Sequence, residues 1–231
     1  MARASHDSVL DAIGIRIVDG ELPAGRVLTL AALEAQYEVS RTVVREAVRV
    51  LEAMGMLAQR RRVGITVRPA IDWSALDTRL IGWQLAGRRR DQLIVNTTEL
   101  RAAVEPVAAR LSARRATDLQ RDEILRLAEE LNRLGAAGRG NSPEYLAADI
   151  AFHDLILVSS GNLMLAAARA PIAAAIEGRA LHGLTPGVPN PDALDNHVAT
   201  AQAISRADAD AAEEHTRLYV AAVLTEVRRT I

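Results

Sequence analysis

Three histidines and one aspartate stand at positions from which they could bind one metal ion. Asp149 and His153 are four residues apart in ADIAFHDLI, so a helix would place both side chains on one face. His197 and His215 stand nine residues before and nine residues after Arg206. In an antiparallel helix pair that turns at Arg206, both would lie at one level, roughly 13 Å from the turn at ~1.5 Å rise per residue. The constellation predicts a site for a divalent ion, zinc first and nickel or manganese as alternatives. Three separate, hydrogen-bonded histidines are the other interpretation.

A run of arginines near the N-terminus forms a second chemical group. Between residues 41 and 68, seven arginines face only two acids, although the whole chain has a net charge of −1. Such a local concentration of positive charge predicts an anionic partner, with a solvated helix face as the alternative. The arginines in the two densest stretches are Arg41, Arg45 and Arg49, which recur every four residues, and Arg60, Arg61 and Arg62.

The pattern around these arginines predicts a winged helix-turn-helix. Helices are expected over 7–19, over 28–38, and from the N-cap Ser40 to about Met54, followed by two short strands joined near Gly64. The third helix can lie in the major groove of DNA, where arginine binds guanine bidentately. The strands form a wing whose arginines can meet phosphates or the minor groove.

The remainder of the chain shows no strand-like alternation and predicts an antiparallel all-α bundle. Glycine- and proline-rich segments separate its helices, which we expect near 75–86, 91–115, 118–134, 143–159, 162–180, 191–205 and 207–229. The fold class is therefore mainly α. The domains expected are a DNA-binding domain over 1–70, a linker and connecting helix over 71–90, and an effector- and metal-binding domain over 91–231.

Composition excludes several other classes of protein. The chain has no cysteine, so neither disulfides nor thiolate metal sites are available. Acids interrupt the apolar residues at the N-terminus, unlike in a signal peptide. No run of about 18 uncharged apolar residues would span a membrane. These features predict a cytoplasmic protein without a membrane partner.

The first domain resembles the GntR family of bacterial regulators. The resemblance rests on DGELPAGRVL, VSRTVVREAVRVLEAMGML and GITV. It implies that Arg41, Thr42, Arg45 and Gly64 touch DNA. The family usually carries an arginine at the start of the second helix, where this chain has Ala31. One DNA contact is therefore missing or is replaced, by Arg26 or by the wing.

The second domain is similar to the FCD ligand-binding domain of the FadR-type members of that family. The matching stretches are ELRAAVEPVAARLSARRAT, ADIAFHDLILVSSGN and HVATAQAISRADADAAEEHTRLYV. The resemblance assigns the metal to the constellation described above, and effector binding to Arg101, Glu105 and Asn162. Residues 72–87 resemble the branch that includes the galactonate regulator DgoR, whose members tend to sense sugar acids; Trp73 and Trp83 would also serve as core residues there.

We therefore expect a homodimeric, DNA-binding transcription repressor. A small carboxylate, a sugar acid such as gluconate or galactonate, would release it from a palindromic operator. A dicarboxylate or other organic acid is the alternative effector. Two other functions remain open, a metal-dependent hydrolase using the Asp/His₃ site and a DNA-architectural protein without an effector. Catalytic turnover would distinguish the first of these, and metal content the second.

Overall fold

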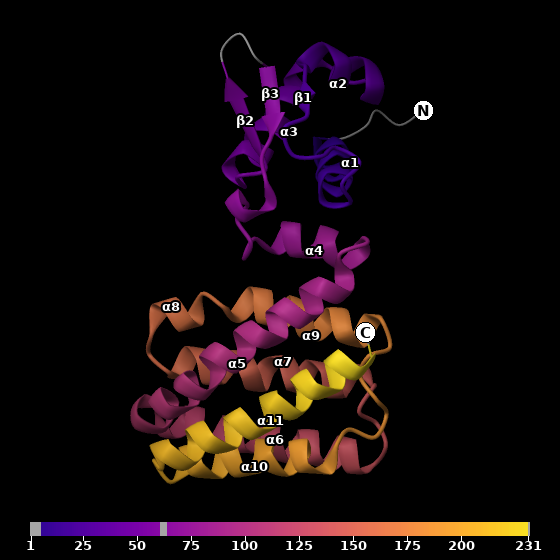
Figure 1. Cartoon of the computed structure of the whole chain (residues 1–231). Helices are drawn as coiled ribbons and strands as arrows, with labels where there is room; N and C mark the ends of the chain where they lie inside the picture. Colours follow the sequence, from indigo (N-terminus) through magenta and orange to yellow (C-terminus); the bar gives the residue numbers. More distant parts are fainter. Residues whose placement is uncertain (1–5, 61–63, 231) are drawn as a thin grey trace. The chain divides into compact units, whose positions relative to one another are not determined.

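A computed structural model describes residues 6–60 and 64–230, which form two compact units (Figure 1). The first unit ends at Arg90 and the second begins at Asp91. Among the described residues, the first contains a small sheet with short helices, and the second contains helices alone. The predicted mainly α fold, with a winged helix-turn-helix and a helical bundle, is confirmed. No helix within the described ranges has the length and hydropathy needed to cross a bilayer.

The N-terminal unit combines helices with a three-stranded antiparallel sheet in the order β1-β3-β2. Thr66 of the central strand pairs with Val27 on one side and Ala58 on the other. The sequence did not predict the first strand, because two residues are too few to show an alternating pattern. The elements are α1 (His6–Val18), β1 (Val27–Leu28), α2 (Leu30–Tyr37), α3 (Arg41–Ala53), β2 (Leu57–Arg60), β3 (Gly64–Val67) and the 3-10 turn η1 (Ala70–Asp72).

Helix α3 forms where the sequence predicts it. The Ser40 hydroxyl accepts from Val43 N at 3.5 Å and begins the helix. Its apolar face, which includes Val44, Val48 and Leu51, is buried against the rest of the unit. Gly55 follows the helix with a φ of 74°, a conformation in which glycine meets no Cβ penalty. The opposite face of α3 stays in solvent.

Helix α4 (Thr78–Ala86), which we expected in a connecting segment, packs against α1 and belongs to the N-terminal unit. Leu80 and Trp83 are part of the core of that unit. Trp83 Nε1 donates to Asp11 Oδ1 over 3.0 Å, and Gly14 leaves room for the indole ring. Trp73 packs against the same core, and its indole donates to Arg68 O at 3.1 Å. Both tryptophans therefore serve in packing.

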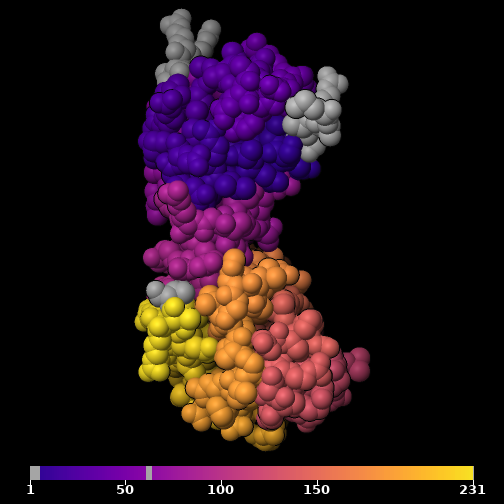
Figure 2. All heavy atoms as spheres, turned by 90° about the vertical axis from the view of Figure 1, so that its right-hand side faces the viewer, coloured from indigo at the N-terminus to yellow at the C-terminus, as the bar shows by residue number. Residues whose placement is uncertain are grey.

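The C-terminal unit is an all-α bundle with one continuous core. Helix α10 packs against α11 and α6, while α7 packs against α6 and α9. In Figure 2 the yellow atoms of α11 lie against the orange atoms of the preceding segments. The helices are α5 (Arg90–Arg115), α6 (Asp118–Ala136), α7 (Pro143–Ser159), α8 (Leu163–Ala166), α9 (Arg169–Leu181), α10 (Pro191–Ser205) and α11 (Ala209–Thr230).

One predicted helix, 162–180, is divided into α8 and α9. Pro171 explains the interruption, because in an unbroken helix it would have no N–H to donate to the carbonyl of Ala167 and its ring would clash with that carbonyl. Asn162 accepts from Met164 N and Leu165 N and begins the short α8.

Candidate functional sites

Helices α7 and α10 bring Asp149, His153 and His197 together. One ligand atom from each side chain lies within 4.8 Å of the other two. Both histidines are buried, whereas Asp149 keeps 17% of its side chain exposed. Asp149 Oδ1 lies 3.2 Å from His153 Nε2, as their four-residue spacing on one helix allows. One carboxylate and two imidazoles form a donor set that suits a divalent metal ion.

His197 is held with one ring nitrogen ready to accept a ligand. Its Nδ1–H donates to Ala193 O over 2.6 Å, and its ring stacks on Tyr219. The buried Nε2 atom has no hydrogen-bond partner among the described residues. Burial, together with the neighbouring His153, lowers the pKa of His197 to about 4, so the ring is neutral at pH 7. A neutral imidazole binds a metal ion through the lone pair of one ring nitrogen. In His197 the Nδ1–H is already hydrogen-bonded, and Nε2, which makes no hydrogen bond to the described residues, can bind the ion.

Glu105 anchors the other imidazole. Its Oε2 lies 3.1 Å from His153 Nδ1 and accepts from the Tyr219 hydroxyl at 3.2 Å, while its Oε1 accepts from Arg101 Nε at 2.7 Å. Although burial alone would raise the pKa of Glu105, the charge of Arg101 and the contact with His153 lower it to about 2. Carboxylates bound in this way fix the ring and tautomer of metal-ligating histidines. With both oxygens engaged, Glu105 is poorly suited to act as a general base.

His215, predicted as a fourth ligand, is not part of this three-residue group. It lies at the expected level of the α10–α11 pair, where its Nδ1 is 2.9 Å from Asn196 Oδ1. Asn196 and His197 point about 100° apart on their helix, since a turn has 3.6 residues. His215 therefore faces the neighbour of His197, and Tyr219, one turn further along α11, contacts the His197 ring. A ligand role for His215 stays a prediction.

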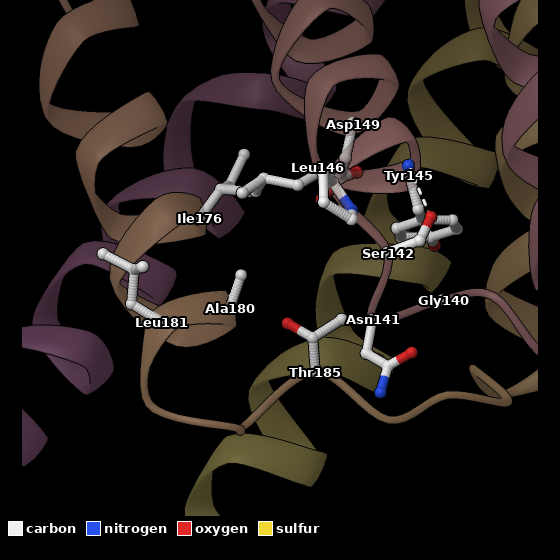
Figure 3. A pocket seen from close by; sticks show the side chains of 11 residues that line it. Gly140, Asn141, Ser142, Tyr145, Leu146, Asp149, Ile176, Ala180, Leu181 and Thr185 are labelled. Atoms are coloured by element: carbon white, nitrogen blue, oxygen red, sulfur yellow. Dashed lines mark hydrogen bonds between the residues drawn. The ribbon is translucent and has the colours of Figure 1, made fainter.

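Two adjoining hollows open beside the cluster. One, of about 200 Å³, lies between α7 and α9, and its wall includes Asp149, Ile176 and Thr185 (Figure 3). The other, of about 50 Å³, shares those three residues and adds Arg101, His153, Arg179 and His197. Both volumes are below the ~300–1,000 Å³ that is usual for drug-sized ligands. We call the two hollows together the bundle cavity; its size favours a small ligand.

The predicted effector-binding residues separate into two places. Arg101 lines the bundle cavity, where its Nη2 donates to His153 Nε2 over 2.8 Å. The Nε of the same guanidinium donates to Glu105. The Asn162 side chain instead caps α8 and is not among the residues that line either hollow. Tyr219 and Arg179 are site residues that the sequence did not single out. Tyr219 stands four residues after His215, and that helical spacing was the available signal, whereas no periodic pattern pointed to Arg179.

The solvent face of α3 carries the side chains expected to read DNA. Arg41, Thr42, Arg45 and Arg49 are all exposed. Arg49 Nη1 donates to Glu46 Oε1 at 2.7 Å, whereas Arg41 lies 3.8 Å from Glu34, too far for a hydrogen bond. The N-terminal turn of α3 therefore presents basic side chains at the end of the helix that enters a major groove in helix-turn-helix proteins.

A concave surface joins that end of α3 to the wing. Arg41, Arg60 and Gly64 line it, together with Ala31 at the start of α2. Gly64 has a φ of 109°, and a Cβ there would stand 3.0 Å from Leu28 O, so glycine lets the two strands approach. Arg61 and Arg62 lie outside the described residues. A basic hollow flanked by an exposed helix end suits a phosphate backbone.

Both parts of the chain match known families. Residues 6–67 match the bacterial regulatory proteins of the gntR family, and residues 96–222 match the FCD domain. The galactonate operon transcriptional repressor of Escherichia coli (strain K12) is 30% identical over 219 residues, covering 93% of each chain. The probable D-xylose utilization operon transcriptional repressor of Paenarthrobacter nicotinovorans is also 30% identical, covering 94% of this chain and 85% of the relative. Among solved structures, a GntR protein of Streptococcus agalactiae is similar with a TM-score of 0.52 and 26% identity, covering 95% of this chain and 99% of that chain.

Proposed function

Because this chain belongs to the GntR family of bacterial DNA-binding transcription regulators and carries an FCD domain, we propose that it is a cytoplasmic repressor released from DNA by a small carboxylate. Curated relatives that match most of the chain are described as repressors of a galactonate operon and of a D-xylose utilization operon. Their names support repression, and the first supports a sugar acid as the effector.

DNA recognition is assigned to α3 and the wing. Arg41, Thr42 and Arg45 would face base edges and Arg49 the backbone, while Arg60 to Arg62 and Gly64 meet phosphates. We propose that a homodimer binds, because two α3 helices related by a two-fold axis read a palindrome. Ala31 offers no guanidinium on this surface, so the wing arginines carry more of the electrostatic attraction.

The metal is assigned to Asp149, His153 and His197, with zinc as the first choice and nickel or manganese as alternatives. The observation that carries this assignment is the buried Nε2 of His197, which lies beside two further ligand atoms and has no hydrogen-bond partner within residues 6–60 and 64–230. His215 is the fourth proposed ligand. When bound, the ion supplies a Lewis-acidic centre for the carboxylate and hydroxyl oxygens of a hydroxy-acid.

Arg101 is assigned to the carboxylate of the effector. Its guanidinium is buried and already fixed by Glu105, so little side-chain entropy remains to be lost. Its Nη2 now donates to His153 Nε2, the atom that an ion would use, so metal binding leaves this donor for the ligand. A planar guanidinium binds a carboxylate in a bidentate manner. A C4–C6 sugar acid such as gluconate or galactonate offers this carboxylate with an adjacent hydroxyl.

To release DNA, the effector must bind the DNA-incompetent arrangement more tightly than the competent one, because equal affinity shifts no equilibrium. The test is a thermal-shift screen of aldonates, lactones, dicarboxylates and fatty acyl thioesters, followed by operator titration. A sugar acid should raise the Tm and release the operator, and Arg101→Ala should lose both effects. Arg114→Ala, an exposed arginine on the same helix, is the matched control. Activity of thioesters or uncharged lactones alone would contradict the proposal.

A further inference from the structure

A second arginine in the bundle cavity lacks adequate partners. Arg179 of α9 is 8% exposed and lines the same hollow as Arg101 and His153. Its Nε atom has no hydrogen-bond partner among the described residues. Its Nη2 lies 3.4 Å from Leu184 O and 3.9 Å from Glu226 Oε1, one distance long for a hydrogen bond and the other beyond it. A buried guanidinium with five N–H donors thus makes one weak bond to the part of the chain that the structure describes.

This arrangement is unfavourable unless something else binds there. Buried charges in proteins are normally paired and hydrogen-bonded, because desolvation of an unpaired ion costs several kcal/mol. Glu226 is the nearest carboxylate, and 35% of its side chain is exposed. By contrast, Glu105 meets Arg101 at 2.7 Å and the pair is almost fully buried. The contrast between the two arginines shows that the protein pairs one of them internally and leaves the other available.

We propose that Arg179 binds a second anionic group of the effector, so that the ligand is a short hydroxylated chain with an acidic group at each end. This inference rests on the proposed function, in which the first carboxylate lies at Arg101 and the metal ligands. A divalent ion held by Asp149 and neutral imidazoles would keep one positive charge, which the first carboxylate neutralises, while the charges of Arg101 and Glu105 cancel. Glu226 lies 3.9 Å from Arg179, beyond hydrogen-bond distance, so the N–H donors of Arg179 can bind a second anionic group. A purely structural role would require Arg179 to tie Leu184 to α9, which its single long bond does poorly.

The second group can be a carboxylate or a phosphoryl group, since arginine binds both through paired N–H donors. Three ligands with one six-carbon skeleton separate these cases. Gluconate ends in a hydroxymethyl group, glucarate in a carboxylate and 6-phosphogluconate in a phosphate. Binding of each to the zinc-loaded, full-length protein is measured by isothermal titration calorimetry. At least one dianion should bind about tenfold or more tightly than gluconate, as expected for a charge-assisted hydrogen bond.

Variants at Arg179 distinguish this inference from the proposed function. Arg179→Ala should weaken the dianion to about the level of gluconate and weaken gluconate itself much less, and Arg179→Lys should restore part of the difference. Arg101→Ala should weaken all three ligands. Arg169→Ala, at the exposed start of the same helix, should change none. Equal binding of gluconate and both dianions, unchanged in Arg179→Ala, would overturn the role of Arg179 while leaving the proposed function intact. If none of the three binds, both the inference and the sugar-acid assignment are wrong.

Discussion

The ring of His197 lies almost flat on the ring of Tyr219, with centroids 4.2 Å apart and planes inclined by 15°. The same tyrosine donates to Glu105, which contacts His153 from the side away from Asp149. One residue of α11 therefore orients both buried imidazoles of the proposed metal site. Such outer contacts typically contribute 10–100-fold to metal affinity. Tyr219 is thus a positioning residue of the metal site.

Metal content is the first expected outcome. Protein loaded with zinc, nickel or manganese should hold about one divalent ion per chain by elemental analysis. His197→Ala should lower occupancy and Tm together, because an ion that binds only the folded state stabilises it. The exposed His182 provides the control, and His182→Ala should keep the metal. A protein that stays metal-free after loading with all three ions would refute the site.

The metal content of His215→Ala tests whether His215 is the fourth metal ligand that we propose. A loss of metal equal to that in His197→Ala would mean that His215 turns from Asn196 toward the ion. Retention of the metal would mean that Asp149, His153 and His197 bind it alone. The readout is again metal per chain, measured after dialysis against a weak chelator.

When a chelator keeps the site free of metal, the free energy of unfolding should depend on pH through the protonation of His197. In the unfolded chain this histidine takes up a proton near pH 6.5, whereas in the fold its pKa is lowered to about 4. The unfolded state therefore binds the proton first, and the free energy of unfolding falls as the pH drops from about 6.5 to about 4. Above pH 6.5 the group contributes no pH dependence.

Urea denaturation with EDTA at pH 7.5, 5.5 and 4.5 measures this effect. His197→Phe keeps an aromatic ring beside Tyr219 but cannot be protonated, so its stability should change less over that interval. His182→Ala should follow the wild type. Parallel curves for the wild type and His197→Phe would mean that His197 is not held neutral by the fold.

The sequence was sufficient to predict the features that depend on helical periodicity. The Asp149–His153 pair needs only a four-residue spacing, and the exposed arginine stripe of α3 follows from the apolar face opposite it. The orientation of His215 was harder to predict. Its height along the helix pair follows from counting residues from the turn, whereas the direction of its side chain depends on how the helix is rotated about its axis. Burial of Arg179 depends on a loop after α9 that carries no periodic signal. An arginine in an alanine-rich helix looks solvent-exposed from sequence alone.

The packing of α4 on α1 predicts opposite effects for two glycines. A Cβ at Gly14 would overlap the Trp83 ring, whereas a Cβ at Gly82 of α4 meets no atom within 4 Å. Gly14→Ala should therefore destabilise the protein by about 1–3 kcal/mol through overpacking. Gly82→Ala should stabilise it by up to about 1 kcal/mol, the difference in helix propensity. Urea denaturation measures both changes. A Gly14→Ala protein as stable as Gly82→Ala would argue against tight packing of Trp83 on α1.

Recognition of DNA should separate into base reading by α3 and phosphate binding by the wing. The test duplex is a palindrome selected by the wild-type protein from random sequences. Arg45→Ala should weaken binding by roughly 1–3 kcal/mol and relax the preference at one base position, because a bidentate contact to guanine is lost. Arg60→Ala should weaken all sequences about equally and reduce the slope of log K against log[salt] by about 0.9, the value for one phosphate contact. Arg133→Ala, an exposed and paired arginine of α6, should leave binding unchanged. Gel-shift titrations over several salt concentrations measure all three variants, and a double variant of Arg45 and Arg60 that binds like the wild type would show that DNA lies on another face.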